Sequence, residues 1–178
     1  MANSKDLEIL KRTNRLDGGD LSGANLTELN LSGSIIKNTN MENVILFDPI
    51  SDEEFEEGQQ NILENFTCVN VNLTNVNLSR IKIYNCRWEN VNLTNVDLSF
   101  IRIHMSLWKK INFTKTKLSN SHIGSTNIHN SNLNSVDMSN SKISQSRFRE
   151  CNLEHANFSH TVFDRSTFKD EDLDADGY

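Results

Sequence analysis

The sequence predicts an all-β solenoid in which the chain winds into square coils of twenty residues that stack on one another. Large apolar residues recur every five positions over most of the chain, and a smaller residue precedes each of them by two positions. Residues twenty positions apart also resemble one another. A period of five fits neither an α-helix, with about 3.6 residues per turn, nor a simple strand with a period of about 2.

The five-residue period appears in two blocks. Over residues 14–46 the large apolar column contains Leu16, Leu21, Leu26, Leu31, Ile36, Met41 and Leu46. Over residues 71–173 a second column, shifted in phase, begins with Leu73, Leu78, Ile83 and Trp88 and continues to Leu173. The smaller inward column contains Val71, Val76, Ile81 and Cys86 at its start. A chain that turns a corner every five residues closes a square coil after four corners, and successive coils pair through backbone hydrogen bonds.

The twenty-residue period is an independent test of this coil. Residues twenty positions apart are of similar type, as in the series Trp88, Trp108, Ile128, Phe148 and Phe168. A second column contains the amides Asn72, Asn92, Asn112, Asn132 and Asn152, with Asp172 closing it. Stacked amides can hydrogen-bond to one another, and asparagine tolerates corner conformations. We therefore assign these asparagines to architecture and not to catalysis.

Several segments then show a family resemblance. They are GANLT (23–27), VNLTN (71–75), VDLSF (96–100), SNLNS (131–135), CNLEH (151–155) and ANFSH (156–160). They resemble the pentapeptide-repeat family, whose consensus is A-(D/N)-L-X-X. The resemblance implies a right-handed quadrilateral parallel β-helix, here of about seven coils. The chain departs from the consensus in residues 71–111, where Val or Ile replaces Ala two positions before the centre.

We expect a single domain over residues 1–178, beginning with a cap. Residues 4–13 within the 1–13 segment have the pattern of a short amphipathic helix, with Ser4 as N-cap and Leu7, Ile9 and Leu10 apolar. A solenoid needs its first coil covered, because bare strand edges invite aggregation. This segment is therefore predicted to cap the first coils at 14–46.

Residues 47–70 are expected to be an acidic insertion between the two blocks. Pro49 ends the preceding coil, and Ser51 with Glu54 forms a capping-box pattern for a short helix. The main rod is expected over residues 71–173, and an acidic tail over 174–178. Asp172, Asp174 and Asp176 match the opening of a calcium loop, but its second half has no counterpart, so we expect no metal site there.

Composition and motifs favour a chain without catalytic activity. Hydrophobic residues make up 36% of the chain, its formal net charge is −6, and it contains no long apolar run. We expect neither a signal peptide in MANSKDLEIL nor any cofactor site. The five histidines fall at unrelated outward positions, whereas Cys86 and Cys151 fall in the inward column and are expected to be buried. Three cysteines without CxxC spacing suit free thiols in a reducing compartment, so we expect a cytoplasmic protein. We also expect the protein to be bacterial.

Charge is distributed unevenly along the predicted rod. Residues 1–72 carry five Lys/Arg and thirteen Asp/Glu, a balance of −8. Residues 73–169 carry thirteen and six, a balance of +7, and the tail adds −5. The main rod is thus basic between acidic ends.

The candidate protein-binding surface consists of outward apolar residues with a charged rim. The apolar residues are Tyr84, Phe100, Met105 and Leu107, and the rim residues are Arg80, Arg102, Lys109 and Lys110. Apolar side chains that point outward and are ringed by cations are typical of an interface centre. Two alternatives stay open: these side chains pack on the 47–66 insertion, or they mediate self-association.

The predicted function is a non-catalytic scaffold that presents a rigid protein-binding surface. Members of the family that confer quinolone resistance are thought to imitate DNA and bind gyrase, but a rod of +7 is a poor polyanion mimic. Gyrase binding by DNA imitation is thus the first alternative function. The second alternative is that the chain is the binding module of a bacterial secreted effector. Direct nucleic-acid binding is disfavoured because the acidic ends would repel a long polyanion, and no membrane partner is expected.

Overall fold

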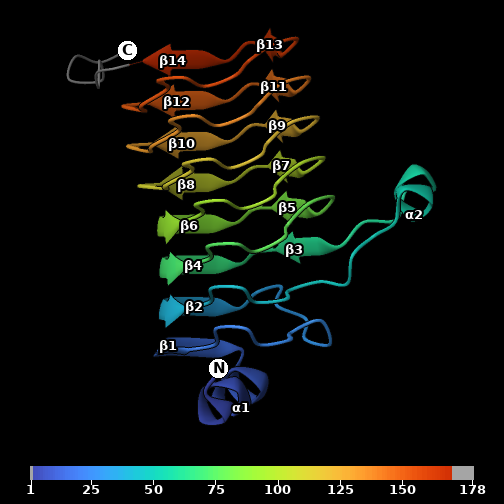
Figure 1. The fold of residues 1–178 in the computed structure, drawn as a ribbon. Helices are drawn as coiled ribbons and strands as arrows, with labels where there is room; N and C mark the ends of the chain where they lie inside the picture. The colour runs from blue at the N-terminus through green and yellow to red at the C-terminus, as the bar shows by residue number, and fades with distance from the viewer. Residues whose placement is uncertain (1, 170–178) are drawn as a thin grey trace.

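The computed structural model describes residues 2–169, which form a parallel β-solenoid of about eight turns (Figure 1). The fold class predicted from the sequence is therefore confirmed. One sheet has eight strands in the order β1-β2-β4-β6-β8-β10-β12-β14, and the other has six in the order β13-β11-β9-β7-β5-β3. All pairs are parallel.

The eight-stranded sheet includes longer strands in the early coils and three-residue strands above them. Its members are β1 (Arg15–Asp20), β2 (Ile35–Asn40), β4 (Thr67–Asn72), β6 (Arg87–Asn92), β8 (Leu107–Lys109), β10 (Asn127–His129), β12 (Arg147–Arg149) and β14 (Thr167–Lys169). The six-stranded sheet contains β3 (Ile62–Glu64), β5 (Lys82–Tyr84), β7 (Arg102–His104), β9 (His122–Gly124), β11 (Lys142–Ser144) and β13 (Val162–Asp164).

The strand register confirms the twenty-residue coil. Trp88 pairs with Cys68 on one side and with Trp108 on the other, each twenty positions away. Ile36 pairs with Cys68, 32 positions away, so the insertion adds 12 residues to one coil. The coil resumes at β3, which begins at Ile62, inside the range 47–70 expected to be insertion. This earlier return corrects that boundary and raises the expected seven coils to about eight.

The corners require a left-handed backbone at every fifth residue. From Asn65 to Arg165 each of these residues has φ between +48° and +61°. Asparagine occupies many of these positions because it adopts this conformation at low cost. The Asn72 column does not take part in these corners, which corrects one reason given for its composition; the corner residues nearest to it are Asn70 and Asn75.

The inward columns fill the core in layers. The rings of Trp88 and Trp108 stack with centroids 4.9 Å apart and planes within 6°. Their indole nitrogens meet no hydrogen-bond acceptor among the described residues, so the pair stabilises the core through packing. Buried hydroxyls in the small column donate to carbonyls of the coil below, as Thr116 Oγ1 does to Leu93 O at 2.7 Å.

The N-terminal helix covers the first coil. α1 (Ser4–Thr13) lies below β1 in Figure 1, with Leu10 buried and Leu7 and Ile9 packed against the core. The N-cap is Asn3 and not the expected Ser4, because the Asn3 side chain accepts a hydrogen bond from the Lys5 amide. The calcium-like motif and the tail at 174–178 lie outside the described residues.

Candidate interaction surface

The outer surface of the coil has four faces, which we name by a buried central residue. The Ile83 face consists of residues 81–85 and their equivalents every twenty positions, and it carries the six-stranded sheet. The Trp88 face consists of residues 86–90 and their equivalents, and it carries the eight-stranded sheet. The Leu73 and Leu78 faces close the square and are linked mainly by isolated bridges such as Asn92 to Asn112 and Asp97 to Lys117.

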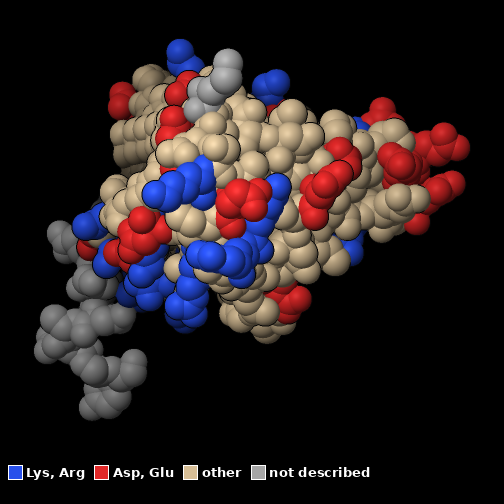
Figure 2. All heavy atoms as spheres, turned by 90° about the horizontal axis from the view of Figure 1, so that it is seen from below, with Lys and Arg blue, Asp and Glu red and all other residues tan. Residues whose placement is uncertain are grey.

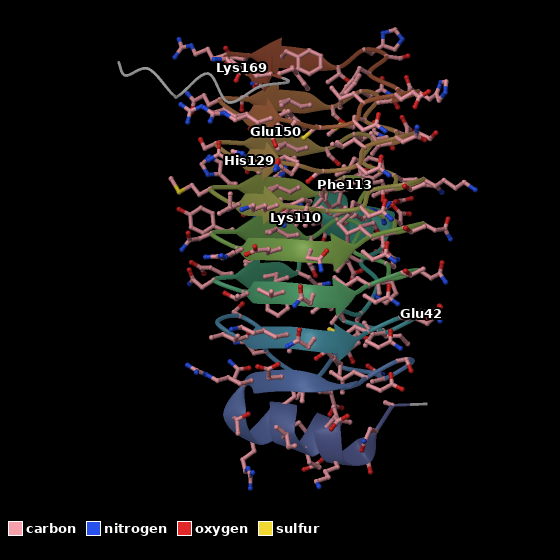
Figure 3. All side chains as sticks on the ribbon, turned by 90° about the vertical axis from the view of Figure 1, so that its left-hand side faces the viewer. Glu42, Lys110, Phe113, His129, Glu150 and Lys169 are labelled. Atoms are coloured by element: carbon pink, nitrogen blue, oxygen red, sulfur yellow. The ribbon has the colours of Figure 1, made fainter. Side chains whose placement is uncertain are left out.

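The positive charge of the rod lies on two adjacent faces. Between residues 81 and 169, the Ile83 and Trp88 faces carry ten cations and three acids, a balance of +7. The cations are Lys82, Arg87, Arg102, Lys109, Lys110, Lys142, Arg147, Arg149, Arg165 and Lys169, and the acids are Glu89, Glu150 and Asp164. The other two faces balance to zero over residues 73–160. Figure 3 views the side that carries Lys110, His129, Glu150 and Lys169, which follow one another along the stack.

The insertion adds a separate acidic feature. It projects from the stack and contains α2 (Asp52–Glu56), with the capping box between Ser51 and Glu54 that the sequence predicts (Figure 1). The hydrogen bond from the Ser51 amide lowers the pKa of Glu54. In Figure 2, acidic side chains gather at the tip that projects from the rod. The acidic side chains of the insertion thus project away from the rod.

Two of the predicted site residues bind this insertion. Arg80 forms an ion pair with Asp52 and donates a hydrogen bond to the Ile50 carbonyl at 2.7 Å. Its guanidinium lies 5.6 Å from the centroids of Phe55 and Phe100, whose rings meet edge to face at 5.9 Å. Phe100 and Arg80 therefore pack on the chain's own insertion, the first of the two alternatives that the sequence left open.

A second group lies at the ridge where the Ile83 and Trp88 faces meet. Tyr84 donates a hydrogen bond from its hydroxyl to Met105 Sδ at 3.0 Å, and its ring stacks on His104 with centroids 6.0 Å apart. Met105 is 52% exposed and Tyr84 is 40% exposed. Met105 also has φ of +54°, at a corner where the coil below has Asn85. A bulky side chain at such a corner costs conformational energy and leaves the thioether exposed.

A groove of about 360 Å³ lies beside this ridge on the Ile83 face. Its lining includes Ile62, Lys82, Tyr84, Arg102 and His104. Ile62 is 53% exposed, and sequence reasoning missed it because it fell within the expected insertion. Its phase, twenty residues before Lys82, is the signal that could have placed it on this face.

The remaining predicted residues lie on the Trp88 face. Leu107 and Lys109 line a shallow hollow of about 300 Å³ together with His129 and Arg149. Lys110 lies at the adjoining corner, with φ of +56°. The predicted surface is thus divided among the insertion contact, the ridge with its groove, and this hollow.

Two ionisable side chains on the basic faces, Glu89 and His122, have shifted pKa values. A hydrogen bond from Arg87 at 2.8 Å lowers the pKa of Glu89, and Lys109 and Lys110 lower it further. Burial, followed by the charge of Lys142, lowers the pKa of His122. Lysine charges contribute to both shifts, but a hydrogen bond is the largest cause at Glu89 and burial is the largest cause at His122.

The cysteines are free, and their thiols are poor nucleophiles. Burial raises the pKa of the Cys86 thiol to about 11 and raises that of Cys68 far above its ordinary value. Cys151 is only partly buried, and its pKa is also raised by burial. Among residues 2–169, no three His, Cys, Asp or Glu side chains gather as a metal site would require. No helix in this described part is long and apolar enough to cross a membrane.

Comparisons with known proteins agree with the coil. A family model described as pentapeptide repeats, in eight copies, matches residues 15–46 and 62–104, and one described as a pentapeptide repeat region matches residues 101–176. The fold and these matches define a repeat protein of the β-helix class. The chain belongs to the pentapeptide-repeat family.

Solved structures with a similar fold share little sequence with the chain. A trypsin-treated form of QnrB1, a plasmid-mediated fluoroquinolone resistance protein, is 13% identical over 86% of this chain and 79% of that one, with a TM-score of 0.47. Rfr23 from the cyanobacterium Cyanothece 51142 is 17% identical over 93% and 98%, with a TM-score of 0.30. HetL from Nostoc sp. strain PCC 7120 is 10% identical over 93% and 94%, with a TM-score of 0.25. The comparison with curated protein sequences found no match.

Proposed function

We propose that the chain is a non-catalytic scaffold whose rigid β-helix presents a protein-binding surface at the ridge between the Ile83 and Trp88 faces. The observation that carries this proposal is the exposure of Tyr84, Met105 and Leu107 beside a cationic rim. Interface centres combine apolar and aromatic anchors with a polar rim. A stacked coil also keeps these side chains in fixed positions, which lowers the entropy lost on binding.

The proposed surface is smaller than the one the sequence predicts. Phe100 and Arg80 already contact the insertion, so we assign them to positioning α2 and not to partner binding. The anchors that remain are Tyr84, Met105 and Leu107, with Arg102, Lys109 and Lys110 around them. This division makes Met105 the most informative position to change.

The charge of these faces does not favour imitation of DNA. A protein that replaces DNA on gyrase must present negative charge, whereas the Ile83 and Trp88 faces carry +7. The three free cysteines suit a reducing compartment, which supports a cytoplasmic location.

The test is capture of a partner by three tagged forms of the chain in cells that naturally express it. They are the wild type, Met105→Glu and, as a matched control, Ser135→Glu on the Leu73 face. Both substituted positions are exposed corners with positive φ, and glutamate already occupies such a corner at Glu150. We expect a protein that crosslinks to the wild type and the control but not to Met105→Glu.

The purified variants should melt at the wild-type temperature, because none of the changed side chains is buried. The same set of captured proteins for all three forms would contradict the proposal. Loss of a captured protein with Ser135→Glu alone would place the binding surface on the opposite side of the rod.

A further inference from the structure

We propose that the groove on the Ile83 face receives an acidic, amphipathic α-helix of the partner protein, an inference that rests on the proposed function. The ligand is thus defined by two properties, a row of carboxylates and an adjoining apolar stripe. The carboxylates correspond to a column of cations on this face, and the apolar stripe corresponds to Ile62 and Tyr84 in the groove.

The cationic column runs along the first outward position of each strand. The strand register aligns the cations Lys82 in β5, Arg102 in β7 and Lys142 in β11. His122 in β9 fills the coil between Arg102 and Lys142, and burial favours its neutral form. In a strand, residues two positions apart point to the same side. The neighbouring column on this face is therefore the one that contains Tyr84.

This neighbouring column begins with Glu64 in β3, is aromatic in the next two coils and is flat in the coil above them. Tyr84 stacks on His104, and Gly124 follows in the next coil. A side chain at Gly124 would meet His104, since an added Cβ would lie 3.0 Å from its Cδ2. Ile62 belongs to the cationic column, where it pairs with Lys82, so apolar surface lies below this lysine and also beside it at Tyr84.

The spacing of the cations favours a helix over an extended peptide. Parallel strands are about 4.8 Å apart, whereas one helical turn rises about 5.4 Å. Over the three steps from Lys82 to Lys142 the mismatch is about 2 Å, which flexible lysine and arginine side chains can absorb. Alternate residues of a strand rise about 6.8 Å, so an extended segment loses register by about 2 Å at every step.

The chain's own insertion shows the same kind of contact at the edge of this face. α2 is a short acidic helix, and it is anchored by Phe55 on Phe100 and by Asp52 on Arg80. A groove of about 530 Å³ runs from Phe55 along the edge where the Leu78 and Ile83 faces meet, and Arg102, His122 and Lys142 line it. The rod therefore already binds one acidic helix through a cation and an aromatic ring.

The ends of the face limit the length of the ligand. Glu64 lies in β3 below the cationic stretch and Asp164 lies in β13 above it. The stretch from Lys82 to Lys142 spans about 14 Å, the length of roughly ten helical residues. A long polyanion such as nucleic acid would meet both carboxylates, and it would leave Ile62 and Tyr84 without an apolar contact.

The test uses a synthetic helical peptide of about 20 residues with glutamate along one side and leucine along the other. Its binding is measured by fluorescence anisotropy, beside a scrambled peptide of the same composition and single- and double-stranded DNA of about 20 nucleotides. The proteins are the wild type, Lys82→Glu with Arg102→Glu, and the matched control Lys115→Glu with Lys117→Glu. Both doubles change the net charge equally, but Lys115 and Lys117 lie on the neutral faces.

We expect the first double variant to weaken peptide binding by about tenfold or more. In this variant two positive charges that face the glutamates of the peptide are replaced by negative charges. The control should stay within about twofold of the wild type, since its charges lie away from the groove. The scrambled peptide should bind more weakly than the amphipathic one. Equal loss in both variants, equal binding of the scrambled peptide, or no peptide binding would overturn the inference.

Tighter binding of DNA than of the peptide, lost in the first double variant, would assign the face to nucleic acid and also overturn the inference. Failure of the proposed function gives a different result, namely capture of the same proteins by wild type and Met105→Glu. A partner captured in a Met105-dependent manner, together with no peptide binding, would leave the scaffold proposal intact and reject only the acidic helix.

Discussion

At the scale of the residue, the asparagine column forms a hydrogen-bonded ladder with a direction. Each side-chain amide donates from Nδ2 to Oδ1 of the residue one coil below, as Asn92 does to Asn72 at 3.2 Å and Asn112 does to Asn92 at 3.3 Å. The ladder continues down through Asn40 and ends at Asp20, which accepts from Asn40 at 3.3 Å. The lowest member only needs to accept, and a carboxylate does so.

A second ladder obeys the same rule. Asn90 donates to Asn70, Asn70 to Asn38, and Asn38 to Asp17, at distances of 2.9, 2.7 and 2.6 Å. In both columns an aspartate stands at the bottom. The longer ladder therefore includes the predicted column from Asn72 to Asn132. The predicted closure at Asp172 lies outside the described residues.

The direction of the ladder predicts that an exchange of amide and carboxylate is tolerated at its lower end and not in its middle. Asn112→Asp removes the donor to Asn92 and to Thr94 Oγ1 and places a carboxylate beside the Asn92 carbonyl oxygen. We expect the free energy of unfolding at neutral pH to fall by about 1–3 kcal/mol, measured by urea denaturation. Asp20→Asn keeps the acceptor and should change it by less than about 0.5 kcal/mol. Similar losses in the two variants would contradict a directional ladder.

At the scale of the element, the insertion is fixed to the rod by a few contacts. Phe55 packs on Phe100, and Arg80 joins the ring pair to Asp52 and to the Ile50 carbonyl. The five-residue α2 has no buried residue, so its position depends on this contact and not on the core. The rod beneath it is held by the strand register and does not depend on α2.

Removal of the cation should release the insertion and leave the rod intact. For Arg80→Ala we expect faster amide hydrogen exchange in residues 48–61 and unchanged exchange in the strands from β5 to β12. The free energy of unfolding should change by less than about 1 kcal/mol, because Asp52 is 84% exposed and the contact holds only the insertion. Arg87→Ala, which loses a pair within the Trp88 face, is the control. Unchanged exchange at residues 48–61 would show that Arg80 does not fix α2.

At the scale of the whole molecule, the solenoid depends on a covered end. α1 lies on the first coil with Leu10 only 1% exposed, and the Asn3 amide donates to the Asp20 carbonyl at 2.7 Å. Parallel coils extend by adding strands, so an uncovered coil can pair with another chain. The helix replaces that pairing with an apolar contact.

Damage to the cap should affect the whole rod. Leu10→Asp buries a charge against the first coil, and we expect a loss of about 3 kcal/mol or more with aggregation on heating. Thermal unfolding followed by circular dichroism and light scattering measures both effects. Lys5→Asp, at an exposed position of the same helix, is the matched control and should melt near the wild-type temperature. Wild-type melting of Leu10→Asp would mean that the first coil does not need α1.

The sequence by itself determined the coil, the inward columns, the N-terminal helix and the capping box of the insertion. These features follow from local periods and local hydrogen bonds, because each five-residue step repeats the same corner and the same burial. The sequence also placed Tyr84, Met105 and Leu107 on the outside, because their phase in the repeat points them outward.

Only the tertiary structure decided which outward residues stay available. The path of the insertion has no period, so the sequence could not show that Phe55 covers Phe100. The return at Ile62 was missed, although its phase, twenty residues before Lys82, could have shown it. The charge balance of +7 was known along the chain, but its concentration on two adjacent faces appears only when the coil is closed. The exposure of a side chain and the local charge depend on which residues of the neighbouring coils lie next to it. Those neighbours are determined by the stacking of the coils and by the position of the insertion.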